Sequence, residues 1–196
     1  MATEVERVMG AQAAIDALKG RHSVWPLVEP GPGADELATV FDLALRAPDH
    51  GGLKPWRFVT VRGDARERLG DILVNAARAR GEENPDRFRS KPMVAPLVIV
   101  PAVRLVQIAK VPEIEQWLSG AAAVMNMLNA LHLMGYGGFW ATGGNAFDPA
   151  VREALGFAAD ERMLGFLFVG TPGPKVESKK RPAYQPFVRE WTGEPG

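Results

Sequence analysis

Three short stretches of the sequence contain side chains that could bind a small molecule. The first is Gly20-Arg21-His22-Ser23, directly after a predicted helix. A guanidinium fork and a hydroxyl group in such a position can hold a phosphate group. The same tetrapeptide is compatible with an ordinary solvated turn, so this stretch alone leaves both interpretations open.

The second stretch begins at Arg46 and continues through Asp49 and His50 to two adjacent glycines. Glycine pairs let a flat ligand approach the backbone closely. Taken singly, each polar residue has an ordinary explanation: Arg46 offsets the helix dipole, Asp49 is a turn residue and His50 is a solvent-exposed ring. Together they favour a ligand-binding loop.

The third stretch is G-G-F-W-A-T-G-G, residues 137–144. A strand bracketed by glycines exposes backbone N–H and C=O groups, which can bind the polar edge of a ring. The alternative is a tight strand between two turns.

Other common chemical motifs are absent from the sequence. There is no cysteine, and the three histidines, His22, His50 and His132, lack the spacing of metal ligands. We find no phosphate-binding Walker loop, no dinucleotide fingerprint and no serine in a nucleophile elbow. We therefore predict no metal site and no catalytic side chain, so that in an enzyme a cofactor would carry the chemistry.

The elements that must position these stretches follow from hydrophobic periodicity and from glycine and proline positions. Helices are predicted over residues 3–18, 35–47, 64–80, 112–134 and 149–155, and strands over 56–61, 96–103, 139–142 and 163–169. Pro48 is expected to end the second helix. Residues 112–134 are apolar on nearly all sides, so this helix is expected to be buried all round, in a central or inter-subunit position. We predict a single α+β domain with a mixed sheet flanked by helices.

Composition narrows the possible partners. The chain has 196 residues, 23 basic and 23 acidic, so its formal net charge is zero. This balance argues against nucleic acid and a charged membrane surface as partners. The basic run Lys179-Lys180-Arg181 is interpreted as a solvated turn. Without an evident signal peptide or a long apolar run, a cytoplasmic location is expected.

Residues 171–196 differ from the rest of the chain. They contain five prolines, together with Tyr184, Phe187, Val188 and Trp191. Disordered tails usually lack such aromatic clusters. We predict a C-terminal arm that packs on a partner subunit, the alternatives being a tail folded back on its own chain or a frayed end.

The chain resembles the nitroreductase family of FMN-dependent oxidoreductases, in its short YdjA-like branch, because six pieces of its sequence match that family in order. They extend over most of the chain, from about residue 14 to residue 191. The pieces are R-H-S (21–23), L-R-A-P-D-H (45–50), P-W-R-F-V (55–59), G-Y-G-G-F-W-A-T-G (135–143), V-R-E-A-L-G-F (151–157) and G-F-L-F-V-G-T-P (165–172).

The resemblance implies an intertwined homodimer with FMN bound at the subunit interface. It assigns Arg21, His22 and Ser23 to the FMN phosphate, and it implies that Arg46 and His50 reach the same flavin from the other subunit. The adjacent glycines would then leave room for the cofactor.

The resemblance also implies that Trp140, Ala141 and Thr142 line the flavin site from the first subunit. The end of the long helix, residues 130–135, would be associated with use of the nicotinamide cofactor. Its position is equally well explained by packing in the core.

The sequence departs from the family pattern at the phosphate site. Many relatives have two arginines before the serine and a third soon after it, whereas this chain has His22 and then Trp25-Pro26. Ala141 stands where relatives can have a basic residue. Fewer permanent charges would therefore face a phosphate of about −1.5 to −2.

The expected activity is that of an FMN-dependent NAD(P)H oxidoreductase. NAD(P)H would reduce FMN and leave, and a nitroaromatic, a quinone or an unknown acceptor would then be reduced in the same place, in ping-pong order. The rival interpretation is a flavin-binding or flavin-modifying protein of the same fold without nitroreductase turnover.

Overall fold

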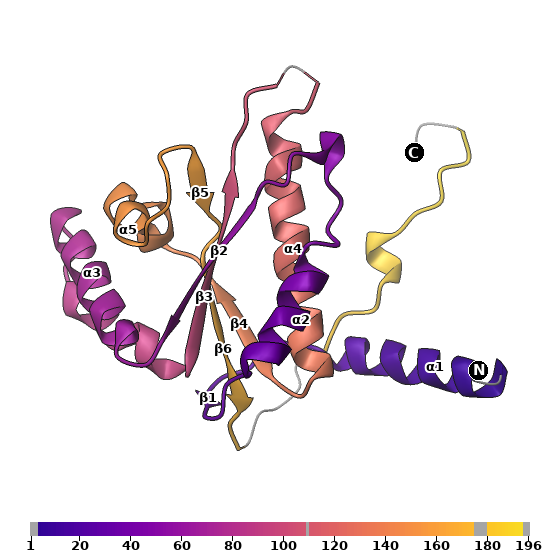
Figure 1. Ribbon diagram of the computed structural model, residues 1–196. Helices are drawn as coiled ribbons and strands as arrows, with labels where there is room; N and C mark the ends of the chain where they lie inside the picture. The colour runs from indigo at the N-terminus through magenta and orange to yellow at the C-terminus, as the bar shows by residue number, and fades with distance from the viewer. Residues whose placement is uncertain (1–3, 109, 175–179, 194–196) are drawn as a thin grey trace.

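The computed structural model describes residues 4–108, 110–174 and 180–193, in which a six-stranded sheet lies between two helical layers (Figure 1). The path β1-β6-β3-β2 forms the sheet, with β4 paired to β6 and β5 paired to β3. The strands are β1 (Leu27–Val28), β2 (Trp56–Arg62), β3 (Leu97–Arg104), β4 (Gly137–Ala141), β5 (Glu161–Met163) and β6 (Phe166–Pro172).

Every strand pair in the described ranges is antiparallel, which differs from the expected mixed sheet. The connection between β2 and β3 gives the physical reason. Helix α3 (Ala65–Ala79) leads the chain away, and the short helices η2 (Pro85–Phe88) and η3 (Lys91–Val94) bring it back along α3. The chain therefore returns to the end of β2, where Arg62 pairs with Leu97.

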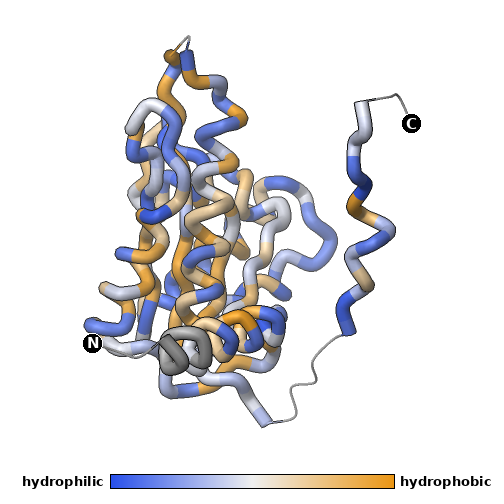
Figure 2. The backbone as a smooth tube through the Cα atoms, turned by 90° about the vertical axis from the view of Figure 1, so that its right-hand side faces the viewer, coloured by the Kyte–Doolittle hydropathy of each residue, from blue (hydrophilic) through white to orange (hydrophobic). Residues whose placement is uncertain are grey.

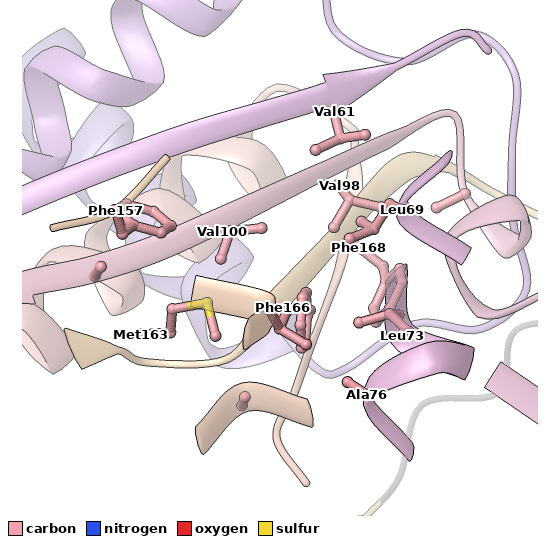
Figure 3. Close-up of a cluster of buried hydrophobic side chains, with 14 of the residues drawn as sticks. Val61, Leu69, Leu73, Ala76, Val98, Val100, Phe157, Met163, Phe166 and Phe168 are labelled. Atoms are coloured by element: carbon pink, nitrogen blue, oxygen red, sulfur yellow. The ribbon is translucent and has the colours of Figure 1, made fainter. Parts of the chain in front are cut away.

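The central strands separate two hydrophobic cores, so the α+β class of a sheet flanked by helices is confirmed. In β3, Val98 and Val100 face α3 and α5 (Pro149–Ala154), whereas Leu97 and Ile99 face α2 (Ala34–Ala44) and α4 (Glu113–Leu133). Figure 3 shows the α3-side cluster around Val98 and Val100. Each fully buried aliphatic side chain contributes about 1.5–3 kcal/mol, so both helical layers are firmly held.

Two predicted boundaries are wrong for local reasons. Helix α2 ends at Ala44, before Pro48, because the chain already turns at residues 45–47. The predicted strand over residues 163–169 is divided into β5 and β6. Gly165 makes the break with φ +124°, and a Cβ atom there would lie 2.4 Å from the carbonyl oxygen of Ala141.

Helix α4 is not buried all round within one chain, so that expectation is wrong for the single subunit. One side packs on the sheet and on α2. The other side carries an uncovered apolar row, which we call the α4 stripe: Ile114, Leu118, Met125 and Leu133. Exposed apolar patches of this kind mark interaction surfaces. None of the helices in the described ranges is long and apolar enough to cross a membrane.

Helix α1 (Glu4–Gly20) and the C-terminal segment both extend from the sheet and its helices (Figure 1), and Figure 2 also shows the C-terminal segment apart from the rest of the chain. The ring of His132 anchors the end of α1, because its Nε2 lies 2.7 Å from the carbonyl oxygen of Ala17. In the C-terminal segment Tyr184, Phe187 and Trp191 are exposed. Residues 175–179 and 194–196 of the predicted arm lie outside the described residues.

The packing of α3 makes Gly70 intolerant of a side chain. A Cβ atom at this buried position would lie 2.3 Å from the backbone oxygen of Arg89. We expect Gly70→Ala to lower the free energy of unfolding by about 1–3 kcal/mol, although alanine normally favours a helix. Gly10→Ala in α1 is the control, since nothing lies within 4 Å there, and it should stabilise by up to about 1 kcal/mol. Urea denaturation measures both, and effects of the same sign would contradict this account.

Candidate functional site

A cavity of about 480 Å³ lies between the α3 side of the sheet and the helices that cover it. Its walls are mainly apolar, with aromatic side chains from several elements and a polar loop at residues 142–145. The aromatic lining residues are Trp25, Phe88, Phe139, Phe166 and Phe168. Figure 3 shows the last two in the same cluster as α3 residues. Such a cavity suits a planar ring with a polar edge.

The segment after α1 reaches this cavity along β4. The backbone N–H of Val24 donates to the carbonyl oxygen of Gly138 at 3.4 Å. The ring of Trp25 then lies 5.3 Å from that of Phe139 and meets Phe168 edge-on at 6.1 Å. The fold thus brings the first and third predicted stretches together.

The first stretch contains one buried polar atom without a partner among the described residues. His22 Nδ1 donates to the carbonyl oxygen of Gly20 at 2.9 Å, whereas its buried Nε2 has no partner in the described part of the chain. Ser23 is exposed beside it. Unpartnered buried polar atoms indicate a missing binding partner.

The charge of a second arginine, in the exposed C-terminal segment, acts on the first stretch. Burial lowers the pKa of Arg21, and the positive charge of Arg181 lowers it further. Two guanidinium groups repel each other unless an anion lies between them. Lys180 and Arg181 are exposed, as expected for a solvated run, but no local pattern predicts the influence of residue 181 on residue 21.

The predicted residues of β4 and its following loop differ in position. Ala141 and Thr142 line the cavity. Trp140 does not line it, and its Nε1 instead donates to the carbonyl oxygen of Leu164 at 2.9 Å, between β5 and β6. Trp140 therefore supports the strand that carries the two lining residues.

A cluster of polar residues fixes the loop after β4, and sequence reasoning missed it. Arg80 Nη2 donates to Asn145 Oδ1 at 2.6 Å and to Glu82 at 2.9 Å, and Nη1 donates to Asp148. Burial acts to lower the pKa of Arg80, but the hydrogen bonds to the two carboxylates outweigh it and the pKa is raised. Arg80 and Asn145 are 65 positions apart, so no local signal links them.

The fold places Arg46 and His50 away from the first stretch. His50 Nδ1 lies 2.5 Å from the carboxylate of Glu115, in the first turn of α4. Arg46 is exposed after α2 and forms no ion pair with the described residues. Asp49 accepts hydrogen bonds from the backbone N–H groups of residues 53 and 54, so it is a turn residue.

Helix α4 separates the two halves of the predicted site. Glu115 lies near its start, whereas His132, which contacts the end of α1, lies near its end. With 21 residues, α4 is about 30 Å long. A single small molecule therefore cannot contact both His50 and Arg21 of one chain.

Comparisons with known proteins agree on one family. The model of the nitroreductase family matches residues 18–171. The chain is 36% identical over 178 residues to the Escherichia coli (strain K12) protein named "Putative NAD(P)H nitroreductase YdjA", covering 89% of this chain and 97% of that protein.

Solved structures show the same fold. A nitroreductase-like family protein from Bacillus cereus superposes with a TM-score of 0.76 at 24% identity, covering 92% of this chain and 96% of the other. The FMN- and NADPH-dependent nitroreductase NfnB from Sphigopyxis sp. strain HMH gives a TM-score of 0.72 at 19% identity, covering 92% and 99%.

The paired arginines predict an anion site that can be tested without any cofactor. Inorganic phosphate, added at constant ionic strength, should raise the melting temperature of the protein. At ten times its dissociation constant the stabilisation would be about 1.4 kcal/mol. Arg181→Gln should remove most of this effect, whereas Arg189→Gln, in the same segment, should retain it. An unchanged response to phosphate in Arg181→Gln would exclude Arg181 from the site.

Proposed function

The chain belongs to the nitroreductase family, and from this premise we propose that it is an FMN-dependent NAD(P)H oxidoreductase. The observation that carries the proposal is the position of Arg21 and of a ring nitrogen of His22, unpartnered within the described ranges, shortly before Trp25, which lines a ring-sized apolar cavity. The names of the E. coli relative and of the Sphigopyxis neighbour support NAD(P)H and FMN as the cofactors.

The residues present fit the chemistry of FMN. Its phosphate needs positive charge and hydrogen-bond donors, which Arg21, Ser23 and Arg181 would offer, and His22 would add a donor at Nε2 with its ring protonated. Arg181 compensates in part for the basic residues that the sequence lacks relative to many family members. The ring system needs a flat apolar space with a polar edge, for which the cavity beside Thr142 is suited.

The protein groups would bind and orient, and none needs to act as a general acid or base. Bound FMN supplies the hydride-accepting ring. Lys91 is the one charged residue that lines the cavity within the described ranges, so its ammonium group would balance negative charge on a reduced ring. Ala141 and Thr142 would border the ring, as the resemblance implies.

If both substrates use the cavity beside Thr142, the reaction would follow a ping-pong order. NAD(P)H and the electron acceptor would have to use the same space in turn, and the first would leave before the second enters. The aromatic walls favour a planar acceptor, either a nitroaromatic or a quinone. Its physiological identity is not encoded in the fold.

The complete site would need a second copy of the chain. In a twofold dimer the α4 stripe packs on the same stripe of the partner. If the two helices run antiparallel, the start of one α4 lies beside the end of the other. Arg46 and His50 of one chain would then approach Arg21 of the partner, at the sheet edge formed by β4.

The C-terminal residues would complete this dimer. Residues 171 and 172 of the predicted arm belong to β6 and pair with β1. Tyr184, Phe187 and Trp191 are exposed on the segment 180–193, so we propose that the rest of the arm packs on the partner. Burial of three aromatic side chains would add apolar contact area to the α4 interface.

The proposed function predicts a yellow protein. Purified protein should show flavin absorbance, release FMN on heating, and oxidise NAD(P)H in the presence of a quinone. Arg21→Ala should raise the dissociation constant of FMN about tenfold or more, because a charged contact is lost. A colourless protein that also fails to take up added FMN would defeat the proposal.

The shared site predicts complementation between two defective chains. We expect chains with Arg21→Ala and chains with both Arg46→Ala and His50→Ala to form homodimers that retain little FMN. A hybrid dimer, isolated with two affinity tags, has one site with all the changes and one intact site. It should therefore bind one FMN per dimer with wild-type affinity. If each site belonged to one chain, the hybrid would contain no intact site and its affinity would stay low.

A further inference from the structure

Asn145 combines three features that the proposed function does not explain. It is 5% exposed, it lines the cavity, and its Nδ2 is a buried donor without a partner in the described part of the chain. Its Oδ1 accepts the hydrogen bond from Arg80 Nη2 at 2.6 Å. Since a guanidinium group only donates, this contact settles which atom of the amide is the oxygen.

Arg80 is itself held in place. Glu82 and Asp148 bind the same guanidinium group, and its side chain is 27% exposed. Asp148 also accepts from the backbone N–H of Ala150, at the start of α5. The plane of the Asn145 amide is therefore fixed from outside the cavity, and its NH₂ group cannot exchange places with its oxygen without loss of the Arg80 contact.

We propose that Asn145 is a specificity-determining residue whose Nδ2 donates a hydrogen bond to an exocyclic oxygen of the planar molecule in the cavity. Arg80 is the positioning residue that orients this donor. The walls around the loop are largely apolar, so a single oriented donor there would discriminate strongly between rings with and without an oxygen at that edge.

The inference rests on the proposed function, and the oxygen has two possible sources. It belongs either to a carbonyl group of the flavin or to the carbonyl or nitro group of the acceptor. Both share the chemistry of a ring oxygen with free lone pairs. The experiment must therefore measure cofactor binding and acceptor use separately.

The test uses Asn145→Leu, which removes the donor without adding charge, and Asn145→Asp, which keeps the shape and the contact with Arg80. FMN affinity is measured by fluorescence titration of the apoprotein. KM is measured on FMN-saturated protein for 1,4-naphthoquinone and for ferricyanide, which has no ring oxygen. Arg78→Lys is the control, because Arg78 lies two residues before Arg80, in the last turn of α3, but pairs with Asp86.

Both Asn145 variants should raise the same constant, either the FMN dissociation constant or the KM for naphthoquinone. The expected increase is about three- to tenfold, the effect of one neutral hydrogen bond. A raised FMN dissociation constant assigns the oxygen to the flavin. A raised KM for naphthoquinone with an unchanged KM for ferricyanide assigns it to the acceptor. Arg80→Lys should shift the same constant in the same direction, since lysine lacks the planar fork that orients the amide.

Two results would overturn the inference. In the first, Asn145→Leu changes only the melting temperature. Its FMN dissociation constant and its KM for naphthoquinone both stay within about twofold of wild type. The other is an effect confined to Asn145→Asp, which would indicate simple charge repulsion. Wild-type protein that binds no FMN would instead defeat the proposed function, a result distinct from either.

Discussion

The position of β6 between β3 and β4 is the constraint on which the rest of the structure depends. Through these two ladders β6 fixes the register of the central strands, and the alternation along each strand then sends side chains to opposite cores. Phe166 and Phe168 face the cavity side, whereas Leu167 and Val169 face α4. One strand therefore supplies both an aromatic wall for a ligand and the support for the helix that carries the uncovered stripe.

Electrostatics add a second condition to this framework. The total charge of the chain is zero, yet Arg21 and Arg181 lie close enough for one to lower the pKa of the other. Like charges that approach each other reduce the stability of the unliganded protein. The arrangement is favourable with a phosphate between them, so the same contacts that cost stability in the free protein would increase affinity for the ligand. Arg80 is in the opposite situation, because its neighbours are carboxylates that stabilise its charge without any ligand. It therefore holds the loop after β4 in place and is not a candidate for binding the phosphate.

How much of the site the sequence predicts depends on the range of the interaction. Arg21 to Ser23 stood out as candidates because an arginine and a serine follow a helix end directly, a pattern that a solvated turn also explains. The third stretch stood out because glycines bracket a strand. Arg181 gave no such signal, because it lies 160 positions after Arg21 in the chain. Arg80 and Asn145 gave none either, because they are 65 positions apart. Likewise, the apolar run over residues 163–169 predicts a buried strand but not its break at Gly165. The break depends on the close approach of the Ala141 carbonyl oxygen, which lies far away in the sequence.

Helix α4 explains why one prediction about burial was wrong for the chain and still informative. A helix that is apolar on nearly all sides requires cover on all sides, and a single subunit covers only the sides that pack on the sheet, on α2 and on the end of α1. The stripe from Ile114 to Leu133 spans almost the whole helix, so a short loop could not cover it. A second α4 has the right length and the same chemistry. Because the site residues divide between the two ends of this helix, the surface that would bury the stripe is also the surface that would unite the site. Dimer formation and completion of the ligand site would therefore depend on the same antiparallel contact.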